Sequence, residues 1–204
     1  MNSTTSIMEN NMETKPELEE IGIVIDRQKD FSTGALKNDD GIANEDRVVE
    51  EINKRPNCRW FYTKDTHGPD FKQTLEGVLP EHCIKGTDGW QYDDKVQAAL
   101  DKFNATCIEK PTFGYLGWVK QILGDGFDPT DQIATAKAAK ARINKIYVFG
   151  TCTDICVTSN VLILRAMFKD TPIAVIAKAC AATPGAQESA LLVLERCGIE
   201  VIRD

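Results

Sequence analysis

Five residues that can take part in acid–base, nucleophilic or metal chemistry follow short apolar runs of strand length. They are Asp26, Asp65, His67, Lys110 and Cys156. The carboxyl ends of parallel strands meet at one edge of an open sheet, and ligands bind beyond that edge. A lone carboxylate after a strand is usually a turn or cap residue. Reactive residues gathered at one edge indicate an active site instead.

Cys156 ends a loop where a helix is expected to begin near Asp154. Free backbone N–H groups and the positive end of the helix dipole stabilise a thiolate there, so we expect the thiol pKa to fall from about 8.5 to about 6. Lys110 would stabilise this thiolate. Asp26 would take the thiol proton and return it to a leaving amine. The arrangement favours acyl transfer by a cysteine.

Histidine occurs only twice in the chain, and both copies fall in one long loop-like segment, residues 66–90. His67 stands two residues after Asp65, and His82 lies near the end of the segment. Two imidazoles and one carboxylate form a three-ligand set for zinc or another divalent cation, with positions left for water or substrate. Ordinary surface-loop histidines are the alternative. Cys83 is a further candidate ligand, although a buried thiol is the simpler expectation.

The elements that must position these residues alternate between strand and helix patterns. Six runs have the length and composition of buried strands: residues 22–26, 59–64, 105–109, 145–149, 172–177 and 199–202. Apolar residues recur at helical spacing after the fourth and fifth runs, namely Val157, Val161, Leu164 and Phe168, then Ala186, Ala190, Leu194 and Cys197. With right-handed crossovers, this order predicts a three-layer α/β fold with a doubly wound, mostly parallel sheet and helices on both faces.

The length of 204 residues fits one domain, expected at residues 21–204. Residues 1–20 hold five glutamates and one lysine and are expected to form a flexible acidic tail. A net charge of -7 argues against nucleic acid and acidic membrane surfaces as partners. No apolar run has the about 20 residues of a membrane-spanning helix. With no secretory signal recognised and seven cysteines, we expect a reducing, cytoplasmic setting.

Taken together, the motifs resemble those of the isochorismatase-like cysteine hydrolases, in particular the nicotinamidase and pyrazinamidase branch. The resemblance spans about residues 21–204 and is carried by VIDRQKDF (24–31), TKDTH (63–67), LPEHCIKGT (79–87), EK (109–110) and GTCTDICV (150–157). It implies that Cys156 is the nucleophile, Asp26 the general acid and base, and Lys110 its charge partner.

The same resemblance places Asp65, His67 and His82 on the metal-ligand positions of the nicotinamidase branch. Isochorismatases proper lack this set. The resemblance therefore implies a divalent metal cofactor, with zinc as the first candidate, and favours an amide-hydrolysing enzyme.

The loop before the nucleophile is also expected to have an unusual backbone. From its position alone, Cys152 is expected to be a small buried residue and not the nucleophile. The resemblance implies a cis peptide bond between Thr151 and Cys152. It also implies an oxyanion hole made of the backbone N–H groups of Cys152 and Cys156.

Two positions depart from the pattern of the nicotinamidase branch. Thr66 stands where the branch usually has tryptophan, and Leu79 stands where it usually has an aromatic residue. A ring-shaped substrate therefore loses a stacking partner. We expect Leu79 to line the substrate pocket together with Phe31 and Phe113.

The function expected from the residues and the resemblance is a metal-containing cysteine amidohydrolase that cleaves a linear amide C–N bond and releases ammonia. Nicotinamide, converted to nicotinic acid, is the first candidate substrate. Other small amides or ureido compounds are the nearest alternative. Two further alternatives are a hydrolase that uses metal-bound water with Cys156 as a bystander, and a non-catalytic binding protein on the same fold. We expect a homo-oligomer with a small-molecule partner.

Overall fold

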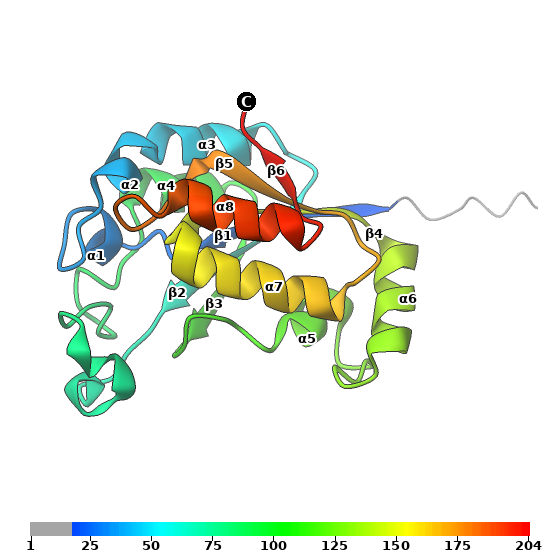
Figure 1. Ribbon diagram of the computed structural model, residues 1–204, viewed down its shortest axis with the longest axis horizontal. Helices are drawn as coiled ribbons and strands as arrows, with labels where there is room; N and C mark the ends of the chain where they lie inside the picture. The colour runs from blue at the N-terminus through cyan, green and yellow to red at the C-terminus, as the bar shows by residue number, and fades with distance from the viewer. Residues whose placement is uncertain (1–17) are drawn as a thin grey trace, which may run out of the picture.

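A six-stranded parallel sheet forms the centre of the computed structural model, which describes residues 18–204 (Figure 1). The strands are β1 (Glu19–Ile25), β2 (Arg59–Asp65), β3 (Thr106–Lys110), β4 (Ile143–Thr151), β5 (Ile173–Ala181) and β6 (Glu200–Ile202). They lie in the order β3-β2-β1-β4-β5-β6, and every pairing is parallel. All six predicted strands are confirmed.

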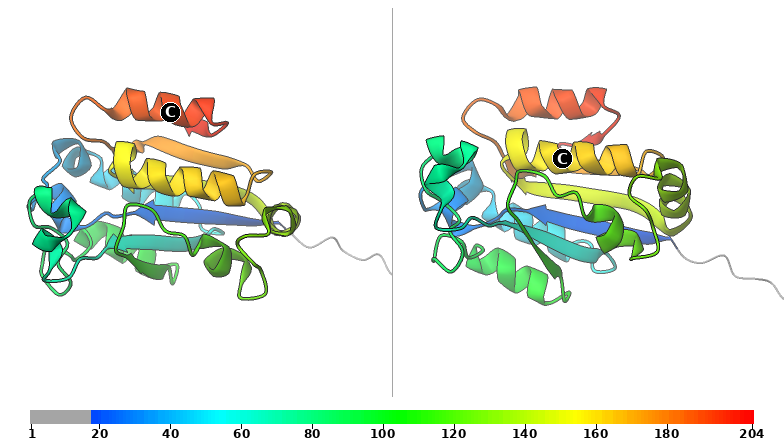
Figure 2. Two further views of the ribbon diagram at one scale, coloured as in Figure 1. Left: turned by 60° about the horizontal axis from the view of Figure 1, so that its bottom comes forward. Right: turned by 90° about the horizontal axis from the view of Figure 1, so that it is seen from below.

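Helices cover both faces of the sheet and complete the predicted three layers. α3 (Glu45–Asn53) and α4 (Asp94–Asp101) pack together on one face, and α7 (Thr158–Met167) and α8 (Gln187–Arg196) pack together on the other (Figure 2). The other helices are α1 (Lys29–Ser32), α2 (Asp39–Ala43), α5 (Trp118–Leu123) and α6 (Gln132–Arg142), with short turns η1 (Phe71–Gln73), η2 (Leu75–Val78) and η3 (Thr153–Val157). None of the described helices is both long and apolar enough to cross a bilayer.

The core explains why the central strands are almost continuously apolar. Ile21, Ile23, Val24 and Ile25 of β1 are fully buried, because helices cover both sides of this strand. Gly22 interrupts the run for a steric reason: a Cβ atom there would lie 2.3 Å from the ring of Trp60 on the neighbouring strand.

The start of the domain lies earlier than predicted. Glu19 and Glu20, which were expected in the tail, are the first residues of β1, and Glu19 forms an ion pair with Arg59 of β2 at 2.7 Å. The rest of the predicted tail, residues 1–17, lies outside the described residues.

The order of the strands fixes where a ligand site can form. From β1 the chain builds outward through β2 and β3, then returns to place β4 on the other side of β1. The carboxyl ends of β1 and β4 therefore flank the point where the winding reverses, which is where open α/β sheets bind ligands. Asp26 follows β1 and Cys156 follows β4, so the topology brings these two residues together.

Candidate active site

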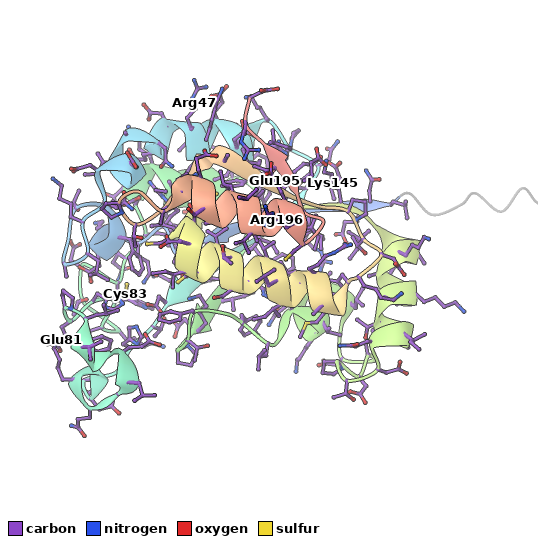
Figure 3. All side chains as sticks on the ribbon, in the orientation of Figure 1. Arg47, Glu81, Cys83, Lys145, Glu195 and Arg196 are labelled. Atoms are coloured by element: carbon purple, nitrogen blue, oxygen red, sulfur yellow. The ribbon has the colours of Figure 1, made fainter. Side chains whose placement is uncertain are left out.

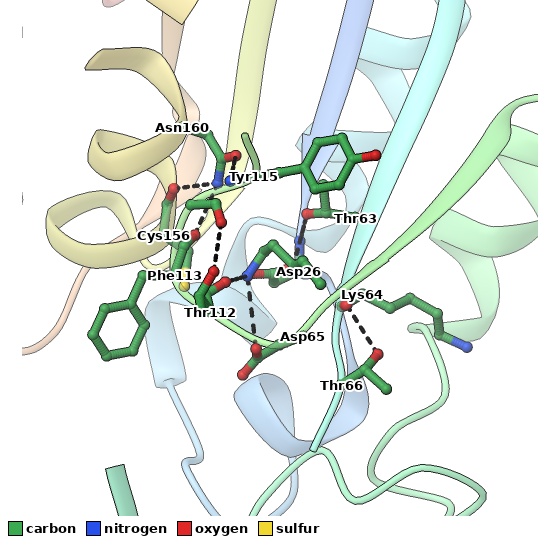
Figure 4. Close-up of polar contacts among 12 residues, drawn as sticks. Asp26, Thr63, Lys64, Asp65, Thr66, Thr112, Phe113, Tyr115, Cys156 and Asn160 are labelled. Carbon is green, nitrogen blue, oxygen red and sulfur yellow. Dashed lines mark hydrogen bonds and ion pairs between the residues drawn. The ribbon is translucent and has the colours of Figure 1, made fainter. Parts of the chain in front are cut away.

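The floor of the site is a buried ion pair between two strand ends. Lys110, the last residue of β3, places its Nζ atom 2.6 Å from Oδ2 of Asp26, and both side chains are fully buried. The Thr63 hydroxyl donates to the other carboxylate oxygen at 2.7 Å. Lys110 also donates to the carbonyl of Thr112 at 3.0 Å (Figure 4). These contacts hold one proton-exchanging carboxylate and one fixed cation next to each other.

The electrostatics of this pair suit Asp26 to proton transfer. Burial raises the pKa of Asp26 above its ordinary value, and the Lys110 cation opposes this increase without cancelling it. Burial alone would lower the pKa of Lys110, but the negative charges nearby, with Asp26 first among them, raise it. Lys110 thus stays protonated, while Asp26 is the group whose proton is exchanged.

Cys156 lies beside this pair, but its thiol does not have the acidity that the sequence predicts. It sits in the π-helical turn η3, and α7 begins only at Thr158. Burial raises the pKa of the Cys156 thiol well above its ordinary value, although Lys110 opposes the shift. The prediction of a lowered pKa is wrong because desolvation of the sulfur outweighs the nearby positive charge. The thiol is therefore protonated in this structure, and Asp26 is a carboxyl group near it whose charge acts on the thiol.

Asn160, which the sequence analysis did not single out, ties the nucleophile turn to the opposite wall. This fully buried residue of α7 uses its amide nitrogen to donate to the carbonyls of Cys156 (2.8 Å) and Phe113 (3.0 Å). Its Oδ1 atom accepts from the backbone N–H of Tyr115 at 3.0 Å (Figure 4). The same atom accepts from the indole N–H of Trp118 at 3.0 Å. The segment that carries Phe113 is thereby fixed against the turn that carries the nucleophile.

We predict that Asn160→Leu leaves four polar partners without their hydrogen bond, two of them buried and two partly buried. Each unpaired buried group costs about 1–3 kcal/mol, with partial relief from relaxation, so we expect the free energy of unfolding to fall by about 3–5 kcal/mol. Urea titration measures this change. Asn53→Leu, at an exposed asparagine of α3, is the matched control and should change stability by less than about 1 kcal/mol. Equal effects at both positions would contradict the role given to Asn160.

The predicted metal ligands converge on the other side of the cavity. Nε2 of His67 lies 3.0 Å and Nε2 of His82 lies 3.4 Å from Oδ2 of Asp65, and one ligand atom from each residue falls within 4.8 Å of the others. Nδ1 of His82 lies 2.8 Å from the carbonyl of Pro80; donation there leaves Nε2 free to bind a cation. Two imidazoles and a carboxylate fit zinc or a similar divalent ion.

Local folding explains how His67 and His82, 15 positions apart, meet. The backbone N–H of His67 donates to the carbonyl of Cys83 (3.0 Å), and the N–H of Lys85 donates to the carbonyl of His67 (2.9 Å). These bonds fold the loop back on itself and bring His82 beside His67. Cys83 is buried inside the loop and is not part of the ligand group, whereas Glu81 is exposed at its outer side (Figure 3).

Burial would raise the pKa of Asp65, but hydrogen bonds with both histidines and the charge of Lys110 lower it, so Asp65 is a carboxylate. A second carboxylate, missed by the sequence analysis, lies close by. Oε2 of Glu76 is buried and lies 3.6 Å from Nε2 of His67. In the sequence, Glu76 could be noticed only as an acidic residue in the loop that carries both histidines.

The two halves of the site face one cavity of about 720 Å³. Cys156, Asp65 and His82 line its inner part, and the three predicted pocket residues, Phe31, Leu79 and Phe113, form its walls. Thr66 does not line the cavity; its hydroxyl accepts a hydrogen bond from Trp90 at 2.9 Å.

The loop before the nucleophile has the predicted cis peptide bond between Thr151 and Cys152. Cys152 itself is half-buried and lines the cavity, so the expectation of a small buried filler is wrong. The reason is the direction of the loop, which turns Cys152 toward the cavity beside Cys156. Burial raises the pKa of Cys152 to about 12, so desolvation opposes ionisation of both thiols that line the cavity.

Comparison with known proteins gives matches that span nearly the whole described chain. The sequence model of the Isochorismatase domain matches residues 20–203. The nicotinamidase/pyrazinamidase PncA from Bacillus subtilis has a similar structure, with a TM-score of 0.71 and 22% sequence identity over 91% of this chain and 100% of that chain. No curated protein is significantly similar in sequence.

Two further solved structures contain molecules relevant to the site. The pyrazinamidase of Pyrococcus horikoshii, in complex with zinc, has a TM-score of 0.70 and 21% identity over 91% of this chain and 99% of that one. PnC1 of L. infantum, in complex with nicotinate, has a TM-score of 0.65 and 18% identity over 91% and 92%. At these identities, the structural likeness shows a shared fold.

Proposed function

Because this chain belongs to the isochorismatase family, we propose that it is a metal-containing cysteine amidohydrolase that releases ammonia from a small amide, with nicotinamide as the first candidate substrate. The observation that carries the proposal is one cavity lined by Cys156, Asp65 and His82. Asp65 in turn contacts His67 at 3.0 Å and lies 3.7 Å from Lys110 of the buried Asp26–Lys110 pair. Another small amide or a ureido compound is the alternative that shares this chemistry.

The reaction begins with proton transfer from the Cys156 thiol to Asp26, whose raised pKa makes it a competent base. The sulfur attacks the amide carbon, and the backbone N–H groups of Cys152 and Cys156 stabilise the oxyanion. Asp26 then gives its proton to the nitrogen as the C–N bond breaks, so ammonia leaves and a thioester remains. Water, deprotonated by Asp26, cleaves the thioester to the carboxylic acid and regenerates the thiol.

Lys110 keeps Asp26 from becoming too weak an acid. Without the Lys110 cation, burial would raise the pKa of Asp26 still further and the carboxyl group would hold its proton.

Asp65, His67 and His82 would hold the divalent metal, zinc being the first candidate, which supplies a Lewis acid for a ring nitrogen or another polar group of the substrate. The zinc and the nicotinate in the two similar structures support this assignment.

A substrate screen tests the proposal. Ammonia release would be measured with nicotinamide, pyrazinamide, ureido acids and simple aliphatic amides, with and without thiol alkylation and chelation. We expect release from at least one of them and its loss on alkylation. Activity that resists alkylation but is lost on chelation would favour a metal-bound water as the nucleophile. No release from any of them would indicate a binding protein.

Seven unpaired cysteines are the basis for proposing a reducing, cytoplasmic location.

We predict that the acid limb of the pH profile reports Asp26. Because burial raises its folded-state pKa, kcat/KM should fall with an apparent pKa above the ordinary value of about 3.9. Thr63→Val removes a hydrogen bond to the charged form, so it should move this limb upward by about one pH unit. Activity on the plateau above the limb serves as the internal control. An unmoved or downward-shifted limb would argue against Asp26 as the titrating base.

A further inference from the structure

The cavity is much larger than a single-ring amide requires. Its volume of about 720 Å³ falls in the range of roughly 300–1,000 Å³ that holds drug-sized ligands. A metal with two or three waters, at about 30 Å³ each, fills only a small part of this space. Apart from the residues around Cys156, the cavity is lined by Ala35, Leu36, Lys37, Asn38, Ala182 and Pro184, and we call the space beside these six residues the outer compartment.

The outer compartment is held in place by specific contacts. The Asn38 side chain donates to the carbonyl of Ala182 at 2.7 Å and accepts from the backbone of Gly41 at 3.1 Å. Arg27, fully buried and paired with Asp93 at 3.0 Å, donates to the carbonyl of Gly41 at 2.8 Å. The segment between α1 and α2 is thereby fixed against the loop after β5, and the space between them is part of the fold.

The inner end of the cavity is closed, which decides how a substrate must lie. Asp26, Lys110 and Thr63 are fully buried and do not line the cavity. The leaving amine takes its proton at this closed end, so there is room for ammonia but not for a substituted amine. With the carbonyl carbon at Cys156, the remainder of the acyl group must extend toward the outer compartment.

The residues that line the outer compartment determine which kind of substituent on the acyl group can bind there. Leu36, Ala35, Ala182 and Pro184 present apolar surface, which favours an apolar group. At the rim, Lys37 is paired with Asp39 at 2.9 Å, whereas the Asp40 side chain forms no ion pair among the described residues. Among the charged residues that line the cavity here, Asp39 and Asp40 outnumber Lys37, which disfavours an anionic substituent.

The geometry points to a substrate class: primary amides whose acyl part is a ring bearing a neutral apolar extension, seated in the outer compartment. This assignment rests on the proposed amidohydrolase function. The reaction is unchanged: the amide C–N bond breaks, ammonia takes the proton from Asp26, and water supplies the hydroxyl of the acid. The unsubstituted single-ring amide is then a poorer substrate than its extended analogue.

A matched substrate series tests the assignment. Nicotinamide would be compared with 5-phenyl- and 6-phenylnicotinamide, with a phenyl analogue bearing a carboxylate, and with N-phenylnicotinamide. We expect at least one phenyl compound to exceed nicotinamide in kcat/KM by about tenfold, mainly through KM. The carboxylate should remove this gain. The N-phenyl compound should not react, and release of aniline would contradict the closed inner end.

Two substitutions test whether the phenyl group binds in the outer compartment. Leu36→Trp places an indole in the outer compartment and should reduce the advantage of the phenyl compound to less than about threefold. Leu192→Trp, at an exposed leucine of α8, is the control and should leave it unchanged. If nicotinamide is hydrolysed but neither phenyl compound has a higher kcat/KM, the assignment is wrong while the amidohydrolase function stands. The same conclusion follows if Leu36→Trp leaves the ratio of the two kcat/KM values unchanged. If no amide releases ammonia, the proposed function fails and the assignment fails with it.

Discussion

Cys156→Ala is expected to lower kcat for amide hydrolysis by at least about 10⁴-fold, because no other side chain is placed to form the thioester. Cys152, the neighbouring thiol in the same cavity, lies before the turn that holds Cys156. The substitution removes one buried sulfur atom, so we expect the fold to persist. Steady-state ammonia release and circular dichroism measure these two outcomes.

Cys197→Ala, at an exposed cysteine, is the control and should retain the rate of the unmodified protein. Cys156→Ser separates the mechanisms further, since a serine hydroxyl is a poor substitute for a thiol in this turn. We expect Cys156→Ser to be as inactive as the alanine variant. Substantial turnover by either Cys156 variant would exclude the cysteine as nucleophile.

The positions of the reactive residues could be predicted because the ends of the strands could be predicted. β1 appears in the sequence as an apolar run, and β2 and β3 appear as short runs of strand length, so the ends of all three are visible in the sequence. Asp26, Asp65 and Lys110 then follow from the rule that strand ends share one edge. The roles of Asp26, Lys110 and Cys156 were inferred from these positions, and the family resemblance agreed with them. Only the resemblance supplied the cis peptide bond, which no local pattern reveals.

The thiol pKa was not predictable because it depends on burial. The sequence shows that a helix begins near Cys156, and this favours a thiolate. It does not show that walls from other segments enclose the sulfur. Desolvation by those walls reverses the direction of the shift.

Asn160 was missed for a related reason. Its side chain bonds to Phe113, Tyr115 and Trp118, more than 40 positions earlier in the chain. The one local signal was a polar residue beside Val161, within the apolar pattern of α7. The outer compartment was equally invisible, since its walls come from two loops that meet only in the fold.

The second large effect is expected at the proposed metal site, where His67→Ala removes one of the three proposed ligands. Metal content should fall below about 0.1 equivalent per chain after dialysis, because Asp65 and His82 alone make a weak site. Elemental analysis measures this independently of activity. Glu81→Ala, at an exposed residue of the same loop, is the control and should retain metal.

The kinetics of His67→Ala then distinguish what the cation does. If Asp65, His67 and His82 hold it to orient the substrate, KM should rise far more than kcat falls, since the Asp26–Lys110 pair and Cys156 remain in place. A collapse of kcat at unchanged KM, together with turnover by Cys156→Ser, would instead assign the nucleophile to water. Full activity in protein that holds less than about 0.1 equivalent of any divalent metal would show that the two histidines serve only to fold the loop. The cysteine site would then act without a cation.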